Sequence, residues 1–286
     1  MATQHSPDAN VYFVPTHSKW PFIGSIAMMV TMVGVASWLN DAGWGKWTFY
    51  AGIAMLVLTL FWWFSDVVRE SQAGHYNHQV DGSFRMGMVW FIFSEVMFFA
   101  IFFGALFYAR VLSVPWLSEG DTMNMLWPGY AGGWPTSGPG GKPFETIGAW
   151  GIPAINTLIL LSSGVTLTWA HWGLLKNKRS QLVLGLFLTV ALGITFIALQ
   201  ALEYHHAYTE LGLTLGAGIY GATFFMLTGF HGFHVTLGTL MLIVILLRSI
   251  KGHFTPESHF GFEGVAWYWH FVDVVWLLLF IFVYAL

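Results

Sequence analysis

Residues 86–110 read MGMVWFIFSEVMFFAIFFGALFYAR, a run that Arg85 precedes and Arg110 ends. Between these two arginines, Glu95 is the single charged residue. A helix needs about 20 apolar residues to cross the hydrocarbon core of a bilayer, because each residue advances it by only about 1.5 Å. A helix also pairs its own backbone amides, which lipid requires, so this stretch predicts a membrane-spanning helix.

The rest of the chain repeats this pattern. Hydrophobic residues make up 56% of its 286 residues and charged residues only 9%, whereas a soluble domain carries charge on about a quarter of its residues. Apolar stretches run over about 20–39, 47–66, 86–110, 148–175, 182–203, 216–248 and 262–285. We therefore expect an all-α fold of about seven transmembrane helices in a single transmembrane domain, 1–286, with the Gly- and Pro-rich residues 113–146 as an external loop.

Composition argues against several classes of function. The chain has no cysteine, which removes disulfides, thiolate metal sites and thiol nucleophiles. Its formal net charge is -3 and its 11 Lys and Arg are scattered, so it offers no basic patch for nucleic acid. Residues 1–19 are polar, with His5, Asp8 and Asn10 among them, and lack the apolar core of a cleavable signal peptide. We therefore expect the first apolar stretch to remain as a helix.

The positions of the cations predict the orientation. With seven spans and a cytoplasmic N-terminus, eight Lys and Arg residues fall on the cytoplasmic side and three fall outside. The cytoplasmic set is Lys19, Arg69, Arg85, Lys176, Lys178, Arg179, Arg248 and Lys251, and the external set is Lys46, Arg110 and Lys142. Because cytoplasmic loops carry an excess of Lys and Arg, we expect a cytoplasmic N-terminus and a C-terminus on the opposite side.

Glu95 lies near the centre of its predicted helix, where a bare carboxylate would cost at least roughly 2.5 kcal/mol. Burial disfavours the anion, so we expect Glu95 to be protonated or hydrogen-bonded to a neighbouring helix. Two interpretations remain open. Glu95 is either a proton-linked or subunit-facing site, or a neutral acid that fixes helix packing.

A second set of polar groups shares one face of the last helix. Glu263, Trp267, His270 and Asp273 are spaced by four, three and three residues, which places them on the same helical face. That face has to point into protein. A hydrogen-bonded or ionic pair of His270 with Asp273 would reduce the cost of burial, and a structural polar cluster is the preferred interpretation.

His231 and His234 lie three residues apart in the sixth span. Such a pair can share a metal ion or ligate haem. The alternative is hydrogen bonding between helices, which the nearby Gly229, Gly232 and Gly238 favour because they allow close packing. On residue chemistry alone, both interpretations stay open.

Charged residues gather where helices are expected to end on the cytoplasmic side. Residues 66–85 combine Arg69, Glu70, His75, His78, Asp81 and Arg85, and a second group holds Arg248, Lys251 and His253. Cations beside a membrane gain about 1 kcal/mol each from anionic lipid head groups. Ordinary topology signals would look similar, but Glu70 and His75 add selective hydrogen bonding that favours a specific site in the first group.

Four blocks of the sequence carry a resemblance to a known family. They are SDVVRES through SEVMFF (65–99), INTLILLSSG through AHW (155–172), GIYGATFFMLTGFHGFHVTLGT (218–239) and HFGFEGVAWYWHFVDVVWL (259–277). Taken in order within seven spans, they closely resemble subunit III of the haem-copper cytochrome c oxidases. The resemblance implies that a cleft filled with bound phospholipids divides the first two helices from the other five.

The resemblance also implies a set of site residues. The buried third-helix acid of the family matches Glu95. Its lipid-contacting positions match Trp62, Trp63, Glu70, His75, Arg85, Arg248, Lys251, His253 and Thr255. The structural polar cluster would contain His231, His234, Glu263, His270 and Asp273, and the chain itself would hold no catalytic residue and no metal.

The function implied by the resemblance is that of a non-redox subunit in a proton-pumping terminal oxidase. That complex reduces dioxygen to water with electrons from cytochrome c, and its haem and copper lie in subunits I and II, the expected partners. The subunit supports proton uptake and stability of the catalytic subunit. The lack of a presequence favours a bacterial inner membrane over an imported precursor, although an organelle-encoded chain would look the same.

Two rival functions follow from the residues themselves. The first is an autonomous membrane enzyme or haem carrier that uses His171, His231, His234 and His270. The second is a proton-coupled transporter built around Glu95 and Asp273, which would then have to line a wet path across the membrane.

Overall fold

The computed structural model describes residues 12–15 and 17–286, and all regular structure in that part of the chain is helical. Seven helices are long and apolar enough to cross a membrane. The predicted fold class, a polytopic all-α membrane protein, is thereby confirmed. Most of the polar N-terminal segment, including His5, Asp8 and Asn10, lies outside the described residues.

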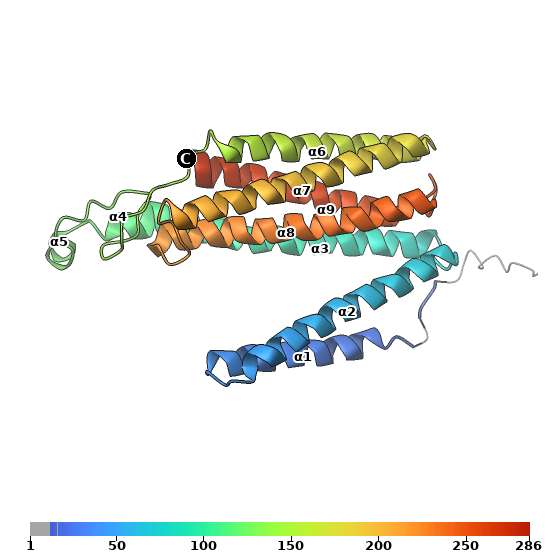
Figure 1. The fold of residues 1–286 in the computed structure, drawn as a ribbon, viewed down its shortest axis with the longest axis horizontal. Helices are drawn as coiled ribbons and strands as arrows, with labels where there is room; N and C mark the ends of the chain where they lie inside the picture. The colour runs from blue at the N-terminus through green and yellow to red at the C-terminus, as the bar shows by residue number, and fades with distance from the viewer. Residues whose placement is uncertain (1–11, 16) are drawn as a thin grey trace, which may run out of the picture. The chain divides into compact units, whose positions relative to one another are not determined.

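Figure 1 shows the helices in chain order. They are α1 (Trp20–Leu39), α2 (Gly45–Gln72), α3 (His78–Phe107), the π-helix η1 (Tyr108–Ser113), α4 (Val114–Trp116), α5 (Asp121–Leu126), α6 (Ile152–Leu175), α7 (Arg179–Thr209), α8 (Gly218–Lys251), α9 (Phe260–Leu279) and the π-helix η2 (Phe280–Ala285). α3, η1 and α4 form one continuous span, and η2 continues α9.

Most helices are longer than the apolar stretches that predict them. α2 continues to Gln72 and α7 to Thr209, past the predicted ends at 66 and 203. The reason is that hydropathy marks the part of a helix that contacts hydrocarbon, whereas the hydrogen-bonded turns continue into polar residues at the membrane surface. α6 begins later than predicted, at Ile152, because Pro153 fits only the first turn of a helix.

The segment 113–146 is less uniform than the predicted loop. Its first residues complete the long third span through α4, and α5 forms a short helix within it. The remainder, up to the start of α6, has turns and extended backbone, with a cis peptide bond between Trp134 and Pro135. Glycine and proline account for the lack of longer helices there.

The chain divides into two compact units, 1–84 and 85–286, so that α3 begins in the first unit and continues in the second. In the first unit, α1 and α2 form an antiparallel hairpin with small residues along the seam. A Cβ atom on Gly52 would lie 2.6 Å from Thr31 Cα, so the two backbones touch there. Glycine is what permits this approach between helices in lipid.

The second unit is built on α6, α7, α8 and α9, which pack as neighbours. The large rings of Trp269 and Trp276 are fully buried between these helices. Trp269 Nε1 donates to Ser163 Oγ and Trp276 Nε1 donates to Thr157 Oγ1, each at 2.9 Å. Hydroxyl groups on α6 thus satisfy the indole N–H groups that burial would otherwise leave unpaired.

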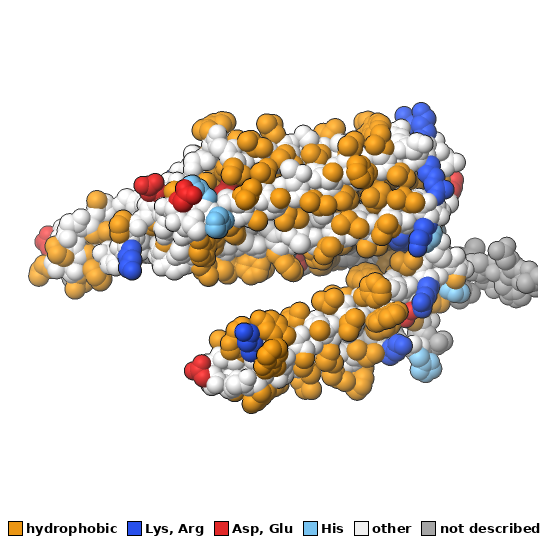
Figure 2. Space-filling view, viewed as in Figure 1, with side chains coloured by type: hydrophobic (Ala, Val, Ile, Leu, Met, Phe, Trp, Pro, Cys, Tyr) orange, Lys and Arg blue, Asp and Glu red, His pale blue; other side chains and the backbone are white. Residues whose placement is uncertain are grey.

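The outside of the second unit matches a lipid-facing surface. Figure 2 shows hydrophobic side chains along the helices and Lys and Arg side chains gathered at the right-hand end of this unit. At that end the guanidinium of Arg179, at the start of α7, donates to the carbonyl oxygen of Ile250 near the end of α8. The connection between α6 and α7 therefore lies beside the end of α8, which brings their cations together.

Candidate functional site

Glu95 on α3 is hydrogen-bonded to His234 on α8, with 2.9 Å between Oε2 and Nε2. The expectation of a partner on a neighbouring helix is confirmed. Rings from both helices surround the contact, with Phe99 at 5.1 Å from the His234 ring centroid. The polar pair is thus embedded in aromatic packing at mid-helix.

The other imidazole nitrogen of His234 determines how many protons this contact holds. Nδ1 lies 2.6 Å from the carbonyl oxygen of Phe230, an acceptor, so Nδ1 carries a proton and donates it. A neutral His234 then offers only a lone pair at Nε2. The hydrogen bond to Glu95 needs one further proton, either on the carboxyl group or on the ring. Glu95 and His234 therefore share one proton.

His231 does not join this pair. Its Nε2 donates to the carbonyl oxygen of Val272 on α9 at 3.1 Å, and its ring is fully buried against Phe196 and Trp276. His231 and His234 therefore point to different partners. This geometry favours hydrogen bonding between helices over a shared metal or haem.

The polar face of α9 is divided among several partners on other helices. Glu263 forms a close ion pair with Arg85 of α3. The Nε2 atom of His270 lies 3.5 Å from Thr168 Oγ1 on α6. Asp273 is buried, and its Oδ1 has no hydrogen-bond partner.

The suggested pairing of His270 with Asp273 is wrong, since no hydrogen bond or ion pair joins these two described side chains. Both turn instead toward α6, where a Cβ atom on Gly164 would lie 3.0 Å from Asp273 Oδ2 and 3.5 Å from His270 Nδ1. The five residues expected in one polar cluster thus form separate contacts.

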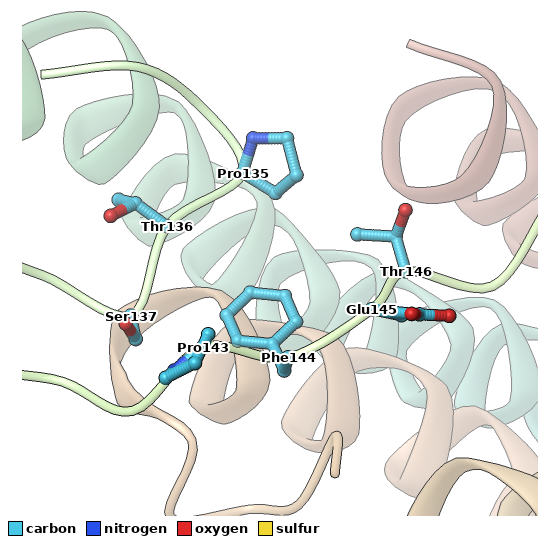
Figure 3. A pocket seen from close by; sticks show the side chains of 7 residues that line it. All are labelled: Pro135, Thr136, Ser137, Pro143, Phe144, Glu145 and Thr146. Carbon is cyan, nitrogen blue, oxygen red and sulfur yellow. The ribbon is translucent and has the colours of Figure 1, made fainter. Parts of the chain in front are cut away.

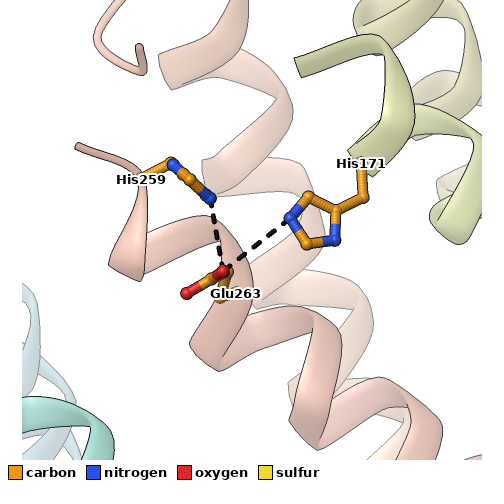
Figure 4. A group of neighbouring side chains, drawn as sticks. All are labelled: His171, His259 and Glu263. Atoms are coloured by element: carbon orange, nitrogen blue, oxygen red, sulfur yellow. Dashed lines mark ion pairs between the residues drawn. The ribbon is translucent and has the colours of Figure 1, made fainter. Parts of the chain in front are cut away.

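Two histidines complete the surroundings of Glu263. Its Oε1 lies 3.2 Å from Nε2 of His259, just before α9, and 3.9 Å from Nε2 of His171 on α6. Figure 4 shows both rings directed at this carboxylate. Sequence reasoning missed His259, although its spacing of four residues from Glu263 places both on one helical face.

The matched lipid-contacting residues of the first unit lie on α2 and just after it. Trp62 and Trp63 are about half exposed. Glu70 Oε2 accepts a hydrogen bond from the hydroxyl of Tyr76 at 2.7 Å, and the His75 ring stacks on Phe13. Burial, followed by the hydrogen bond and the charge of Glu70, raises the pKa of Tyr76. Its hydroxyl therefore remains a donor at neutral pH.

The matched residues of the second unit surround the start of α9. Arg85 lies over the ring of Phe260 and Arg248 over the ring of Phe254. Lys251 and Thr255 are exposed. The sequence-matched residues thus fall into two sets, one in each unit.

His253 lies in the same connection as Thr255, between α8 and α9. Burial, and then the positive charges of Arg248 and Lys251, lower the pKa of His253 below its ordinary value of 6.5. At neutral pH its ring is therefore uncharged, and the two basic side chains carry the positive charge of this connection.

Two hollows lie away from these groups. A shallow one on the loop before α6 is lined by Pro135, Thr136, Ser137, Pro143, Phe144, Glu145 and Thr146 (Figure 3). Phe144 there stacks on Tyr220 of α8, which fixes the loop to the bundle.

The second hollow is an apolar groove between α3 and α9, lined by Phe103 and Val274 among other residues and by Arg110. Its lining suits an acyl chain.

These observations define a class. The chain is a multi-pass helical membrane protein whose mid-helix Glu95 is paired with a neighbouring helix and whose second unit ends in a group of cations.

Comparison with known proteins identifies the family. The family model described as cytochrome c oxidase subunit III matches residues 10–286. Proteins named cytochrome c oxidase subunit 3 from Squalus acanthias and Cyprinus carpio are each 42% identical over 96% of this chain and 97% of their own length. One from Marchantia polymorpha is 42% identical over 93% of both chains. The chain belongs to the cytochrome c oxidase subunit III family. It is therefore a subunit of an oxidase complex in respiratory electron transport.

Proposed function

We propose that this chain is a non-redox core subunit of a proton-pumping oxidase, which reduces dioxygen to water with electrons from cytochrome c. Haem and copper lie in subunits I and II, its partners, and subunit I is the main contact. The chain supports proton uptake into subunit I and protects it during turnover, through its helix bundle and bound phospholipids.

One observation carries this proposal: the second unit gathers its cations at one end, around the start of α9, while Glu95 at mid-helix is satisfied within the chain. Such a molecule presents charge to lipid head groups and to a neighbouring subunit near the membrane surface. The commitment of His231 and His234 to other partners supports a role without haem in this part of the chain.

The lipid role rests on exposed side chains of two kinds. Lys251 and Thr255 are exposed beside the partly buried Arg248, a combination that suits a phosphate group. Trp62 and Trp63 are exposed aromatic rings, which suit the interfacial and acyl regions of a lipid. Glu70, His75, Arg85 and His253 complete the proposed lipid-contacting set. The lipid-filled cleft that divides the first two helices from the other five remains a prediction from the resemblance.

The orientation is part of the same proposal. A cytoplasmic N-terminus places Arg85, Lys176, Arg248 and Lys251 on the cytoplasmic side, in agreement with the excess of cations expected there. It also places the C-terminus in the periplasm of a bacterial cell inner membrane. A protease-access map of membrane vesicles from the native host tests this assignment.

A transporter built on Glu95 and Asp273 is less well supported. Glu95 is bonded to His234 among aromatic rings, and Asp273 turns toward Gly164 on α6. The two carboxyl groups therefore have separate surroundings. The proton shared by Glu95 and His234 is either exchanged during turnover or only fixes packing. Carbodiimide labelling together with the activity of Glu95→Gln distinguishes the two roles.

The test compares oxidase particles with and without this chain. We expect particles that lack it to take up protons more slowly and to lose activity after fewer turnovers. Both quantities are measured on the same preparation, with haem content as the control for intact catalytic subunits. An unchanged uptake rate together with an unchanged turnover lifetime would refute the proposal.

A further inference from the structure

Three side chains from three places in the sequence converge at the cation-rich end of the second unit. They are His171 near the end of α6, His259 just before α9, and Glu263 in the first turn of α9. Within residues 12–15 and 17–286, they are the one group of three or more His, Asp or Glu side chains whose ligand atoms lie within 4.8 Å of one another.

The two imidazoles have no hydrogen bond at the nitrogen atoms that face Glu263. The Nε2 atoms of His171 and His259 are both buried and have no hydrogen bond. His259 as a whole is only 8% exposed. Both atoms are directed at Glu263 Oε1, at 3.9 and 3.2 Å (Figure 4). Buried polar atoms without partners are uncommon, and an ion is one established reason for them.

The remaining contacts prepare these atoms to bind a metal ion. His259 Nδ1 lies 3.1 Å from the carbonyl oxygen of Thr255, so Nδ1 carries the proton and Nε2 presents a lone pair. Arg85 binds Oε2 of Glu263 and leaves Oε1 as the atom that faces the histidines. Metal-ligating imidazoles and carboxylates usually have such outer hydrogen bonds.

The spacing fits a tetrahedral ion. Ligand atoms about 2.0 to 2.1 Å from zinc lie roughly 3.3 Å from one another. The Nε2 atom of His259 lies 3.2 Å from Glu263 Oε1, the Nε2 atom of His171 lies 3.9 Å from it, and all three ligand atoms lie within 4.8 Å of one another. Binding of the ion would therefore draw the His171 ring closer. Hard cations such as Mg²⁺ prefer oxygen ligands, whereas two imidazoles and one carboxylate suit zinc.

We propose that His171, His259 and Glu263 form a binding site for a divalent metal ion of the zinc class, with water as the fourth ligand. The ion ties the end of α6 to the start of α9. Zinc has no redox chemistry of its own, so the site is compatible with a non-redox subunit but does not depend on the proposed proton-uptake and lipid roles.

The charges nearby set how tightly the ion is held. Arg85 is ion-paired to the same carboxylate, and Arg248 Nη1 would lie 3.0 Å from a Cβ atom on Gly261. Both guanidinium groups repel a cation. Replacing Arg85 with Gln should therefore tighten zinc binding by about tenfold or more, because a unit charge a few Å away is removed.

The main experiment measures zinc in the purified, assembled oxidase. Wild-type complex and the His259→Gln and His171→Gln complexes are stripped with a chelator, dialysed against zinc and analysed by mass spectrometry. We expect the wild type to hold one zinc ion more than either variant. Equal zinc content in all three complexes would overturn the proposal.

A matched control comes from another histidine–carboxylate pair. His206 Nδ1 lies 3.1 Å from Glu210 Oε2 in an exposed pair near the end of α7, outside the three-residue group. His206→Gln should leave the zinc content unchanged. A loss equal to that of the His259 variant would show non-specific binding and would also overturn the proposal.

Diffraction decides the matter without any variant. Crystals of wild-type complex soaked in zinc should give an anomalous peak between His171, His259 and Glu263 at the zinc absorption edge. A map without this peak would show that the imidazoles only form ion pairs with Glu263. A peak at the iron edge instead would replace zinc with iron and refute the assignment of the metal.

Discussion

The hairpin of α1 and α2 and the bundle of α6 to α9 are built on different principles. In the most apolar part of α1 and α2, 17% and 11% of the residues are buried, against 39% in each of the four later spans. The hairpin is held by a seam of small residues such as Gly34 and Gly52. The bundle buries Trp269 and Trp276 and bonds their indoles across helices.

This difference shows which helices are held together by contacts within the chain. Lipid is as apolar as a leucine side chain, so helices in a membrane associate through packing and hydrogen bonds rather than through the hydrophobic effect. The bundle supplies both internally. The hairpin supplies only close backbone contact and leaves rings such as Phe61 and Trp62 exposed.

The largest test of the comparison removes a ring from each region. Trp269→Ala should destabilise the bundle by about 3 kcal/mol, because it leaves a cavity and removes the indole N–H that donates to Ser163 Oγ. Trp62→Ala, at a half-exposed position of α2, should cost well under about 1 kcal/mol. Both variants are tested by heating the assembled oxidase and measuring the temperature at which this chain is lost from the complex. Equal shifts would mean that the bundle is no better packed than the hairpin.

A smaller effect is expected from the seam of the hairpin. Gly52→Leu places a side chain against the backbone of Thr31 and should separate α1 from α2, at a cost of about 2 kcal/mol. Gly24→Leu is the matched control, because a Cβ atom there meets nothing within 4 Å. Hydrogen exchange by mass spectrometry should show faster exchange in α1 and α2 for the first variant only. Faster exchange in α6 to α9 as well would contradict the separation into two units.

The contrast also explains what the sequence could and could not predict. The spans follow from hydropathy because hydrocarbon surrounds them uniformly. A hydrogen-bond partner for Glu95 was also predictable, because burying a lone carboxylate in hydrocarbon costs free energy. The identity of that partner, His234, depends on how α3 and α8 are rotated and shifted against each other. Hydropathy carries no information about rotation, so the sequence links His234 only with its neighbour His231.

Local spacing was misleading in one case and overlooked in another. His270 and Asp273 are three residues apart, yet both side chains point to α6 instead of to each other. Thr168 on α6 offers a contact to His270, and Gly164, which has no side chain, leaves space for Asp273. His259 precedes the apolar run, in a polar connection, so its sequence position does not mark it as a polar group at membrane depth. Its role depends on His171, which is distant in sequence and adjacent only after α6 and α9 pack.

The shared proton of Glu95 and His234 gives a further, smaller effect. Glu95→Gln keeps a donor for the lone pair of His234 Nε2 and should change stability by less than about 1 kcal/mol, whereas Glu95→Ala leaves that atom unpaired and should cost about 1 to 3 kcal/mol. Carbodiimide labelling of the wild-type complex should modify Glu95 if the proton resides on the carboxyl group. Absence of labelling, with normal activity of Glu95→Gln, would assign Glu95 to packing alone.

The smallest expected effect concerns the charged ends of the two units. In the hairpin, Arg69 is paired with Asp66 and Glu70 with Tyr76, whereas Lys251 of the bundle is exposed. Lys251→Gln should lower retention of anionic phospholipid about fivefold, the equivalent of roughly 1 kcal/mol per cation. Arg69→Gln should change it less. Native mass spectrometry of the oxidase counts the retained lipids.

The pH dependence of this lipid retention separates His253 from its basic neighbours. Because the pKa of His253 lies below 6.5, its ring is neutral at pH 7 and gains charge only as the pH falls through that lowered value. Wild type and His253→Gln should therefore retain the same amount of anionic lipid at pH 7 to 8 and differ only below pH 6.5, where the wild type retains more. Lys251→Gln should be deficient across the whole range. If His253→Gln already loses lipid at pH 8, His253 contacts the head group as a neutral hydrogen-bonding group, and the cationic account of this connection is wrong.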